Sequence, residues 1–440
     1  MMETISQGWT GPIHEFGTAR CCSKNGPRRR IQWLVVVTFA VALAGFPLIA
    51  LLPPLFNVES RVITVPFRAF CVFFSCVVLA VYGIYRNHLV RGWYWFGVTM
   101  LWALLLIRMT FDLIIHPIAT VIPSSDYWPM ALGLSLVLPL SLAVVGTRET
   151  YTIGRRICFP LVCIAAVLIA GTGLRSYSSS AYSEGRLGTE VLNPISIGQL
   201  GASLVILSLS GPLLKRRWLD VTLRIVSSGV GVMMTLLTNA RGAQGALFIC
   251  ILLLMIKAGR KPFIILILSV VCLAYPFIQV VDMVESSTQI RVFGRWSETI
   301  DPTQTTSAGF RIVLLQRAFQ QFLEHPVTGN AMVEVESGLY PHNIVAEAFM
   351  ATGIMGGVVL LGLLVFGCRC ANKLVSSGPA YRWIGLLYFQ VVVASMLSGS
   401  LLADNSFWIW SHAAVAAFAA VRRDRMRPVR PVMKRWVRGN

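Results

Sequence analysis

Residues 31–52 read IQWLVVVTFAVALAGFPLIALL, a run without a single charged side chain. The hydrocarbon core of a bilayer is about 30 Å thick, and a helix of about 20 apolar residues crosses it. Every backbone group inside that core has to be hydrogen-bonded within the protein, which a helix achieves within one segment. This run therefore predicts a membrane-spanning α-helix.

The same pattern recurs along the rest of the chain. Of its 440 residues, 55% are hydrophobic and 13% are charged, whereas about a quarter of the residues in a soluble domain are charged. We predict an all-α polytopic membrane protein with about 12 transmembrane helices. The predicted spans are residues 31–52, 67–85, 92–115, 128–146, 156–174, 194–213, 219–238, 242–257, 262–281, 343–367, 382–402 and 405–421.

The positions of lysine and arginine predict the orientation. When the connecting segments are assigned alternately to two sides, one side holds far more of these residues, even without the two tails. Such an excess marks the cytoplasmic side, so both termini are expected there, in basic tails at residues 1–30 and 422–440. The net charge of +19 is explained by orientation. Because no aromatic-basic interleaving or zinc spacing accompanies it, we expect no nucleic-acid partner. The first apolar run starts too late and is too long for a cleavable signal peptide.

The spans divide the chain into two blocks around a long external segment. Residues 31–281 are expected to form helices one to nine, and residues 342–421 helices ten to twelve. The external loop at residues 282–341 lies between them, and loops of this length are usually functional or disordered. Within residues 308–324, apolar residues recur at helical spacing against polar ones, which predicts an amphipathic helix on the membrane surface. The apolar positions are Leu315, Ala318, Phe319 and Phe322.

Cysteine usage and motif spacing exclude several kinds of site. The chain has 10 cysteines, but none falls in a predicted external loop, so a disulfide framework is not expected. No pair of cysteines has metal-ligand spacing, and there is no phosphate loop, HExxH motif or nucleophile elbow. We therefore expect neither a metal nor another cofactor.

His342 is the first candidate for chemistry. It lies where the chain enters the tenth predicted span from the outside. A histidine there can accept or donate a proton near neutral pH. The alternative is an interfacial histidine that makes a helix-cap contact, and position alone favours this alternative.

Four of the eight arginines on the predicted external side, where basic residues are not favoured, are candidates for binding. Arg241 occupies a short turn at the membrane edge, Arg175 and Arg186 bracket a polar loop, and Arg311 opens the amphipathic helix. Each can be an ordinary loop charge or a snorkelling side chain. Together they form a basic outer face, and because the guanidinium fork matches phosphate oxygens, they would suit an anionic ligand.

Ionisable residues inside the predicted spans are interpreted as contributing to the structure and not to the chemistry. Arg108 and Asp112 lie four residues apart in the third predicted span, where pairing reduces the unfavourable free energy of a charge in hydrocarbon. His412 in the twelfth span is interpreted as a packed or hydrogen-bonding residue between helices.

One motif resembles a known family. Residues 341–356 read PHNIVAEAFMATGIMG, which places His342, Asn343, Gly353 and Gly356 in register. This pattern is similar to the hallmark of the O-antigen ligase and O-antigen polymerase superfamily: a histidine, a polar residue, nine further residues and then Gly-x-x-Gly.

Other segments are similar to the same family. Residues 238–242 (TNARG) resemble its Ser-Arg-Gly turn, and residues 185–188 with 193–198 resemble the loop before its sixth span. Residues 310–318 and 325–329 resemble the segment before the histidine, although the usual Gly-x-Gly appears here as Gly329-Asn-Ala. By motif the resemblance covers residues 185–365.

The resemblance implies a metal-independent inverting glycosyltransferase of the bacterial inner membrane, with a fold similar to the GT-C class and the external face in the periplasm. Its partners would be a glycan on undecaprenyl diphosphate, membrane lipid and an acceptor sugar on lipid A core (ligase) or on a lipid-linked repeat unit (polymerase). The motifs do not separate these two acceptors. A lipid-linked oligosaccharide transporter or flippase and a non-catalytic scaffold remain as alternatives.

The resemblance also suggests residue roles. His342 would act as general base, and Arg241, Arg311 and Arg186 would bind the donor diphosphate. Asn343 and Arg175 would support them. Glu347 would orient the histidine or line the acceptor site, and a packing role for it is equally compatible with the sequence.

Overall fold

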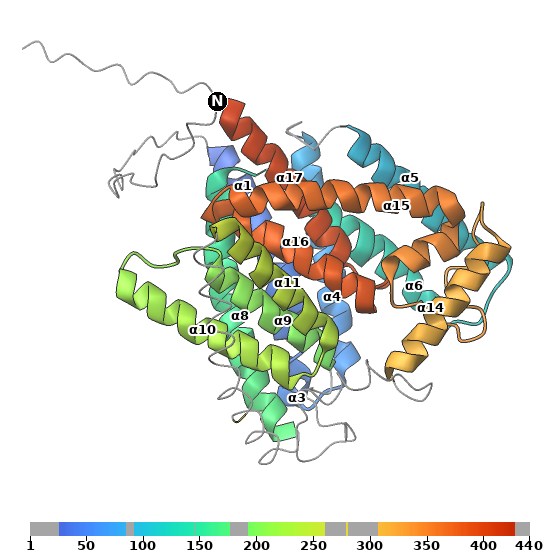
Figure 1. The fold of residues 1–440 in the computed structure, drawn as a ribbon, viewed down its shortest axis with the longest axis horizontal. Helices are drawn as coiled ribbons and strands as arrows, with labels where there is room; N and C mark the ends of the chain where they lie inside the picture. The colour runs from blue at the N-terminus through green and yellow to red at the C-terminus, as the bar shows by residue number, and fades with distance from the viewer. Residues whose placement is uncertain are drawn as a thin grey trace, which may run out of the picture.

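The structure is a computed structural model that describes residues 26–84, 92–144, 146–176, 192–259, 279 and 307–426. In these residues the elements of the first half are α1 (Gly26–Ala40), η1 (Val41–Gly45), α2 (Phe46–Ile49), α3 (Leu52–Phe56), α4 (Ser60–Ile84), α5 (Trp93–Thr110), η2 (Phe111–Ile115), α6 (Ser124–Trp128), η3 (Pro129–Val137), α7 (Leu138–Leu142) and α8 (Arg148–Ser176). The second half holds α9 (Pro194–Leu209), α10 (Arg217–Leu237), α11 (Arg241–Ala258), α14 (Ser307–Glu324), α15 (Ile344–Ser376), α16 (Pro379–Ser398) and α17 (Ser406–Met426). The described part is thus a helical bundle (Figure 1).

The prediction of a polytopic helical membrane protein is confirmed. Eight helices among the described residues are long and apolar enough to cross a bilayer, and they coincide with eight of the predicted spans. The predicted spans 128–146, 194–213 and 405–421 are also helical, as α6 to α7, α9 and α17. The span predicted at 262–281, much of the 282–341 loop and most of both tails lie outside the described residues, so the full number of spans stays a prediction.

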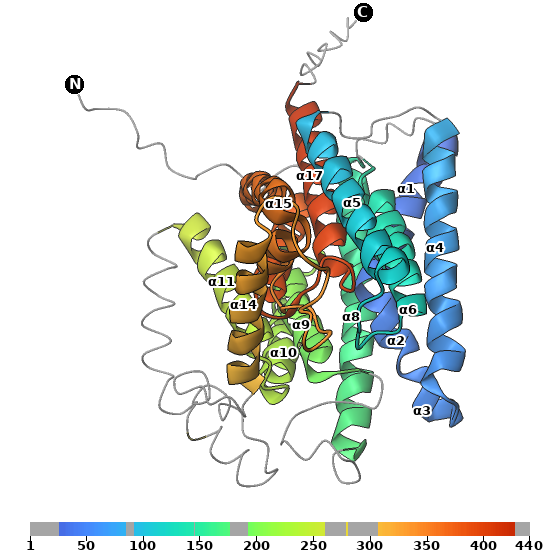
Figure 2. The same cartoon turned by 90° about the vertical axis from the view of Figure 1, so that its right-hand side faces the viewer.

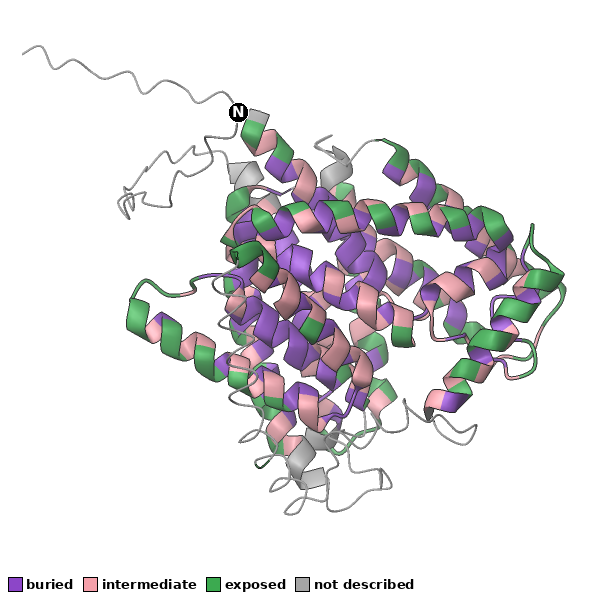
Figure 3. Cartoon of the chain, in the orientation of Figure 1, coloured by how far each residue is buried: buried purple, intermediate pink, exposed green. Residues whose placement is uncertain are grey.

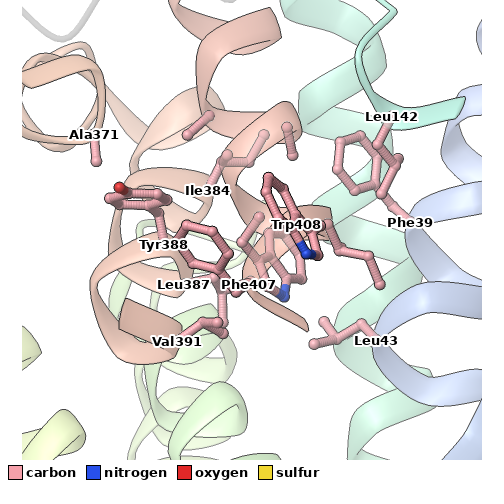
Figure 4. Packing of buried hydrophobic residues seen from close by; sticks show 14 of the residues in the cluster. Phe39, Leu43, Leu142, Ala371, Ile384, Leu387, Tyr388, Val391, Phe407 and Trp408 are labelled. Atoms are coloured by element: carbon pink, nitrogen blue, oxygen red, sulfur yellow. The ribbon is translucent and has the colours of Figure 1, made fainter. Parts of the chain in front are cut away.

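The core of the bundle forms around α16 and α17. Trp408 and Phe407 of α17 pack between Phe39 of α1 and Tyr388 of α16 (Figure 4). Buried residues fill the interior, and exposed ones lie on the outer helix faces (Figure 3). Many of those outer residues are large and apolar, such as Phe73 on α4. Helix α4 itself lies at the edge of the bundle (Figure 2). An apolar outer surface of this kind is expected where a helix faces lipid.

α15 is broken near its start, and the break positions the preceding segment. Gly353 has φ +65°, a conformation that L side chains rarely adopt, and a Cβ there would lie 2.2 Å from the Val327 oxygen. The turn at residues 325–330 docks into this break, because Ile354 N donates to Pro326 O at 2.8 Å and Asn330 N donates to Met350 O at 2.8 Å. The break explains why a glycine is needed at position 353.

Arg108 and Asp112 form the predicted structural pair, with 3.5 Å between Nε and Oδ1. They also hold the next part of the same segment. Arg108 donates to the Asn330 carbonyl, and Met332 N donates to Asp112 Oδ2 at 2.7 Å. The pair therefore connects α5 to the chain that leads to His342.

The described end of the long segment that is predicted to be external is folded. The predicted amphipathic helix is α14, but its apolar residues do not share one environment: Ala318 is buried, whereas Leu315 and Phe319 are exposed. The helix therefore has two apolar sides, since α14 packs Leu314 and Ala318 inward and leaves a second apolar strip outside. After α14, Glu334 accepts hydrogen bonds from Glu336 N and Ser337 N at 3.0 and 2.9 Å.

The bundle has two ends, which α16 connects. At its Pro379 end lie the start of α8 and the end of α17, because Arg423 Nη2 donates to Gly146 O at 2.9 Å and Tyr381 donates to Asp424. At its Ser398 end lies the start of α15, because Asn343 Nδ2 donates to Met396 O at 3.0 Å. The candidate site residues gather at the Ser398 end.

Candidate functional site

The last turn of α16 is the point where the predicted site residues meet. Arg311 on α14 donates from Nη1 to Leu397 O and to Ser398 Oγ, both at 3.0 Å. Asn343 reaches the same turn through Met396 O. Three segments far apart in the sequence are therefore joined by one helix end.

His342 lies beside this turn in an unusual backbone conformation. Its φ is +57°, in the left-handed region that few residues other than glycine adopt. The ring is packed edge-on to Tyr340, with 4.5 Å between the ring centroids. Its Nδ1 is buried and has no hydrogen-bond partner in the described part of the chain. Such strained residues cluster at functional sites.

The surroundings of His342 keep its imidazole neutral. Burial and, to a smaller extent, the positive charge of Arg311 lower the pKa of His342 to about 4, while a backbone hydrogen bond with Ser398 opposes the shift. The effect of Arg311 requires that the two side chains lie close together. At neutral pH the ring therefore has a free acceptor nitrogen next to a guanidinium.

Asn343 is the N-cap of α15. Its Oδ1 accepts hydrogen bonds from Val345 N and Ala346 N, both at 3.0 Å. The N-cap of α15 is thus supplied by the residue after the histidine, while His342 itself contacts the backbone of Ser398 at the end of α16, so the alternative of an interfacial histidine that makes a helix-cap contact stays open. The cap fixes the direction in which the chain passes from His342 into α15.

Arg241 is the first residue of α11, at the same end of the bundle. The neighbouring Gly242 lies against Leu397, since a Cβ at Gly242 would be 3.7 Å from Leu397 Cβ. The turn before it is also tightly packed, because Asn239 has φ +48° and a Cβ at Gly198 would lie 2.7 Å from Thr238 Oγ1. The fold therefore brings the Arg241 turn to the helix end that Arg311 contacts.

The other two arginines are less defined. Arg175 lies in the last turn of α8; the start of α8 is at the Pro379 end, so Arg175 belongs to the opposite end, with His342. The side chain of Arg175 and the whole of Arg186 lie outside the described residues. Their roles stay predictions.

Glu347 is buried among residues of another segment. It is 1% exposed, and its carboxylate accepts from Ser400 Oγ at 2.9 Å and from Leu401 N at 2.8 Å. These partners belong to the link between α16 and α17, so the carboxylate holds that link and not the His342 ring. The packing role is the one that the geometry favours.

Two polar residues near the site were missed by the sequence analysis. Burial raises the pKa of Asp404, and burial together with the charges of Glu347 and Asp404 raises the pKa of Tyr340. Asp404 falls in the short external link between two predicted spans, which was the available signal. Tyr340 lies two residues before His342, but nothing in its spacing predicts the ring contact.

The arrangement suits proton transfer and anion binding. A neutral imidazole can take a proton, and guanidinium groups can stabilise developing negative charge on phosphate oxygens. Among the described residues, no group of three His, Cys, Asp or Glu side chains is placed to hold a metal ion.

Comparison with known proteins bears on these residues directly. Residues 225–361 match the model of the protein family described as O-antigen ligase. The resemblance to the O-antigen ligase superfamily is confirmed. The matched residues include the three described site residues Arg241, Arg311 and His342, and the O-antigen ligase match ends just beyond the break at Gly353. A search of curated proteins finds no match to the chain.

Proposed function

We propose that this protein is a glycosyltransferase that moves a glycan from undecaprenyl diphosphate to an acceptor sugar hydroxyl on the periplasmic side of the bacterial inner membrane. The family match supports a membrane enzyme of the O-antigen ligase and polymerase type. The observation that carries the proposal is the meeting of His342, Arg311 and the Arg241 turn at the Ser398 end of α16.

In the proposed step, His342 removes the proton of the acceptor hydroxyl as that oxygen attacks the anomeric carbon of the donor. A new carbon–oxygen bond forms, the bond between the anomeric carbon and the diphosphate oxygen breaks, and undecaprenyl diphosphate leaves with the bonding electrons. Attack from the face opposite the leaving group inverts the anomeric centre. At neutral pH the ring of His342 carries no extra proton, so it is in the form that can accept one from the hydroxyl.

The leaving diphosphate would be stabilised by Arg311 and Arg241, with Arg186 and Arg175 as further contributors. Preorganised charges of this kind stabilise the charge that develops in a transition state, and removal of one donor typically lowers kcat by about 10²- to 10³-fold. Arg311 is already oriented by Leu397 O and Ser398 Oγ. No metal ion is required in this scheme, because the guanidinium groups compensate the diphosphate charge.

The exposed apolar strip of α14 suits the lipid part of the donor. Phe310, Leu315, Phe319 and Leu323 are each at least 40% exposed, on the helix that carries Arg311. A polyprenyl chain that lies along this strip would bring its diphosphate to Arg311. Membrane lipid would cover the same strip when no donor is bound.

The test is transfer by the purified full-length protein from an undecaprenyl-diphosphate-linked glycan. His342→Asn should lower the rate by about 10²-fold or more, while the protein keeps its thermal stability, because asparagine tolerates a positive φ. His116→Asn is the matched control, since His116 is an exposed histidine outside the site, and it should transfer normally.

Three outcomes would contradict the proposal. Full transfer by His342→Asn would exclude the general base. Movement of the lipid-linked glycan across the bilayer with its linkage intact would indicate a transporter. Polysaccharide production in cells that depends on the protein but not on His342 would indicate a scaffold. In cells that lack the protein, accumulated long lipid-linked chains would identify a ligase, and accumulated single repeat units a polymerase.

A further inference from the structure

The opposite end of α16 holds a group of arginines that the proposed reaction does not use. Arg382 lies one turn into α16, and the 16 residues between it and Ser398 correspond to about 24 Å of helix. Arg155 on α8 and Arg224 on α10 lie near it. These residues are too far from His342 to belong to the site described above.

Arg155 is the centre of this group. The residue is 2% exposed, and its Nε and Nη1 are buried without a hydrogen-bond partner in the described part of the chain. Only Nη2 is engaged, as a donor to the Pro212 carbonyl. A guanidinium group is always charged, and a buried charge without compensation is strongly unfavourable. Two of its three nitrogens therefore lack an acceptor.

The neighbours of Arg155 add positive charge. Arg156, Arg224 and Arg382 lie close enough for their charges to repel that of Arg155. Arg224 and Arg382 are fixed by backbone acceptors: Arg224 Nε donates to Ser208 O at 2.7 Å, and Arg382 Nε donates to Val375 O at 3.1 Å. Carbonyl groups orient these side chains, but a neutral carbonyl group does not neutralise the charge of a guanidinium group.

The one carboxylate that acts on Arg155 in the described residues is already engaged. Asp220 lies 3.5 Å from Arg224 Nη1 and accepts from Leu213 N and Leu214 N at 2.5 and 2.9 Å. It thereby holds the link between α9 and α10 against the start of α10. Arg155 and Arg224 consequently share a single carboxylate whose other oxygen is used by the backbone.

The close packing around Arg155 depends on a glycine at position 211. Gly211 has φ +147°, and a Cβ there would lie 2.5 Å from Pro379 and 3.0 Å from Arg155 Nη1. The absence of a side chain at Gly211 therefore lets the α9–α10 link, the start of α16 and the arginine come together. Next to this link, Lys215, Arg216 and Arg217 are exposed and raise the local concentration of anions.

We propose that Arg155, Arg224 and Arg382 form a phosphate-binding site at the end of the bundle opposite His342. The guanidinium fork matches phosphate oxygens, and arginine clusters between membrane helices are typical sites for anionic lipid headgroups. The partly exposed Arg224 and Arg382 receive the phosphate, and a shift of their side chains brings its oxygens to the free nitrogens of Arg155. The phosphate belongs either to an anionic lipid or to a free ion.

The test uses the purified full-length protein with two probes. In nanodiscs or detergent, cardiolipin is titrated against phosphatidylcholine by native mass spectrometry, and inorganic phosphate is titrated by thermal shift. Arg382→Gln and Arg155→Gln should each weaken binding by about tenfold, the effect of losing one charge-assisted interaction. Arg369→Gln is the control. Arg369 is an exposed residue of α15 at the same end of the bundle, so this substitution removes the same charge without changing the cluster.

The outcomes distinguish the two sources. Loss of cardiolipin retention in both variants, with no response to phosphate, assigns a lipid headgroup. A phosphate-dependent thermal shift that the variants lose, with no cardiolipin preference, assigns a free ion. Equal binding of both probes by the original protein, the two variants and the control overturns the proposal. If Arg155→Gln does not fold, Arg382→Gln alone carries the test, since its side chain is partly exposed.

Discussion

The two ends of α16 treat charged side chains in opposite ways. At the Ser398 end, Arg311 donates to two oxygen atoms and Glu347 accepts two hydrogen bonds, so both side chains are held by the chain around them. At the Pro379 end, Arg155 is buried with two nitrogens unengaged in the described part of the chain. The comparison indicates that the first end is organised by the protein itself, whereas the second requires an anion to complete it.

The organisation of the Ser398 end has a functional consequence. Catalytic charges contribute most when they are fixed before the reaction, because no reorganisation is then needed in the transition state. The segment that carries His342 is attached at the α15 break, at the Arg108–Asp112 pair and at the Asn343 cap. Each attachment can be broken separately, which gives a graded series of tests of this end.

The largest effect is expected from Gly353→Ala. The added Cβ would lie 2.2 Å from the Val327 oxygen, in a backbone with positive φ. We expect a loss of about 3 kcal/mol or more in stability, with loss of glycan transfer, measured by thermal unfolding of the purified protein and by the transfer assay. Gly362→Ala on the same helix is the control, because a Cβ there meets nothing within 4 Å, and it should be neutral or slightly stabilising. Similar unfolding temperatures for the two variants would refute the docking at the break.

Asp112→Ala should have the next largest effect. It leaves Arg108 without its partner and Met332 N without its acceptor, at a loss of about 2 kcal/mol. Asp112→Asn should lose less, because it keeps an acceptor for Met332. Exposed Asp126, changed to alanine, should stay within about 0.5 kcal/mol of the original protein. Thermal unfolding distinguishes these cases, and an unchanged unfolding temperature for Asp112→Ala would show that the pair does not hold the segment.

Helix positions followed from the sequence, whereas contacts between helices did not. A run such as 31–52 is long and apolar enough to require a helix, whatever its neighbours are. The pairing of Arg108 with Asp112 also followed, because it depends only on a four-residue spacing. The second function of that pair, binding Asn330 and Met332, depends on a segment more than 200 residues away, and no local pattern encodes such a contact.

The arrangement of the candidate site could be predicted only in part, for the same reason. His342 and Arg241 belong to short motifs, so their identity could be read locally. That Arg311 and Asn343 meet at the end of α16 depends on how α14, α15 and α16 pack. The role of Glu347 was ambiguous, because one turn of helix separates it from Asn343 whether it faces His342 or the α16–α17 link.

Glu347→Gln should cause a smaller loss than the two changes above. The amide nitrogen replaces one of two acceptor oxygens, and the Ser400 hydroxyl can accept from it, so at most one hydrogen bond is lost. We expect transfer to fall by about tenfold or less, with expression unchanged. Glu324→Gln, on an exposed residue of α14, is the control. A loss as complete as that of His342→Asn would instead make Glu347 part of the proton transfer.

The smallest effect concerns pH. Because the pKa of His342 is lowered to about 4, the free enzyme should keep a neutral base from neutral pH down to about 5. At low donor concentration, transfer should then decline only as the pH approaches 4. In Arg311→Met a repelling charge is lost, so the pKa of His342 rises and the decline moves to higher pH, by less than removal of the burial would cause, since burial is the larger cause. Arg317→Met, which removes a charge paired with Glu336 on the same helix, should leave the profile in place. Comparison of the three pH profiles therefore tests whether the charge of Arg311 acts on His342. A decline near pH 6.5 in the original protein would show that the His342 ring is not held in the buried environment described above.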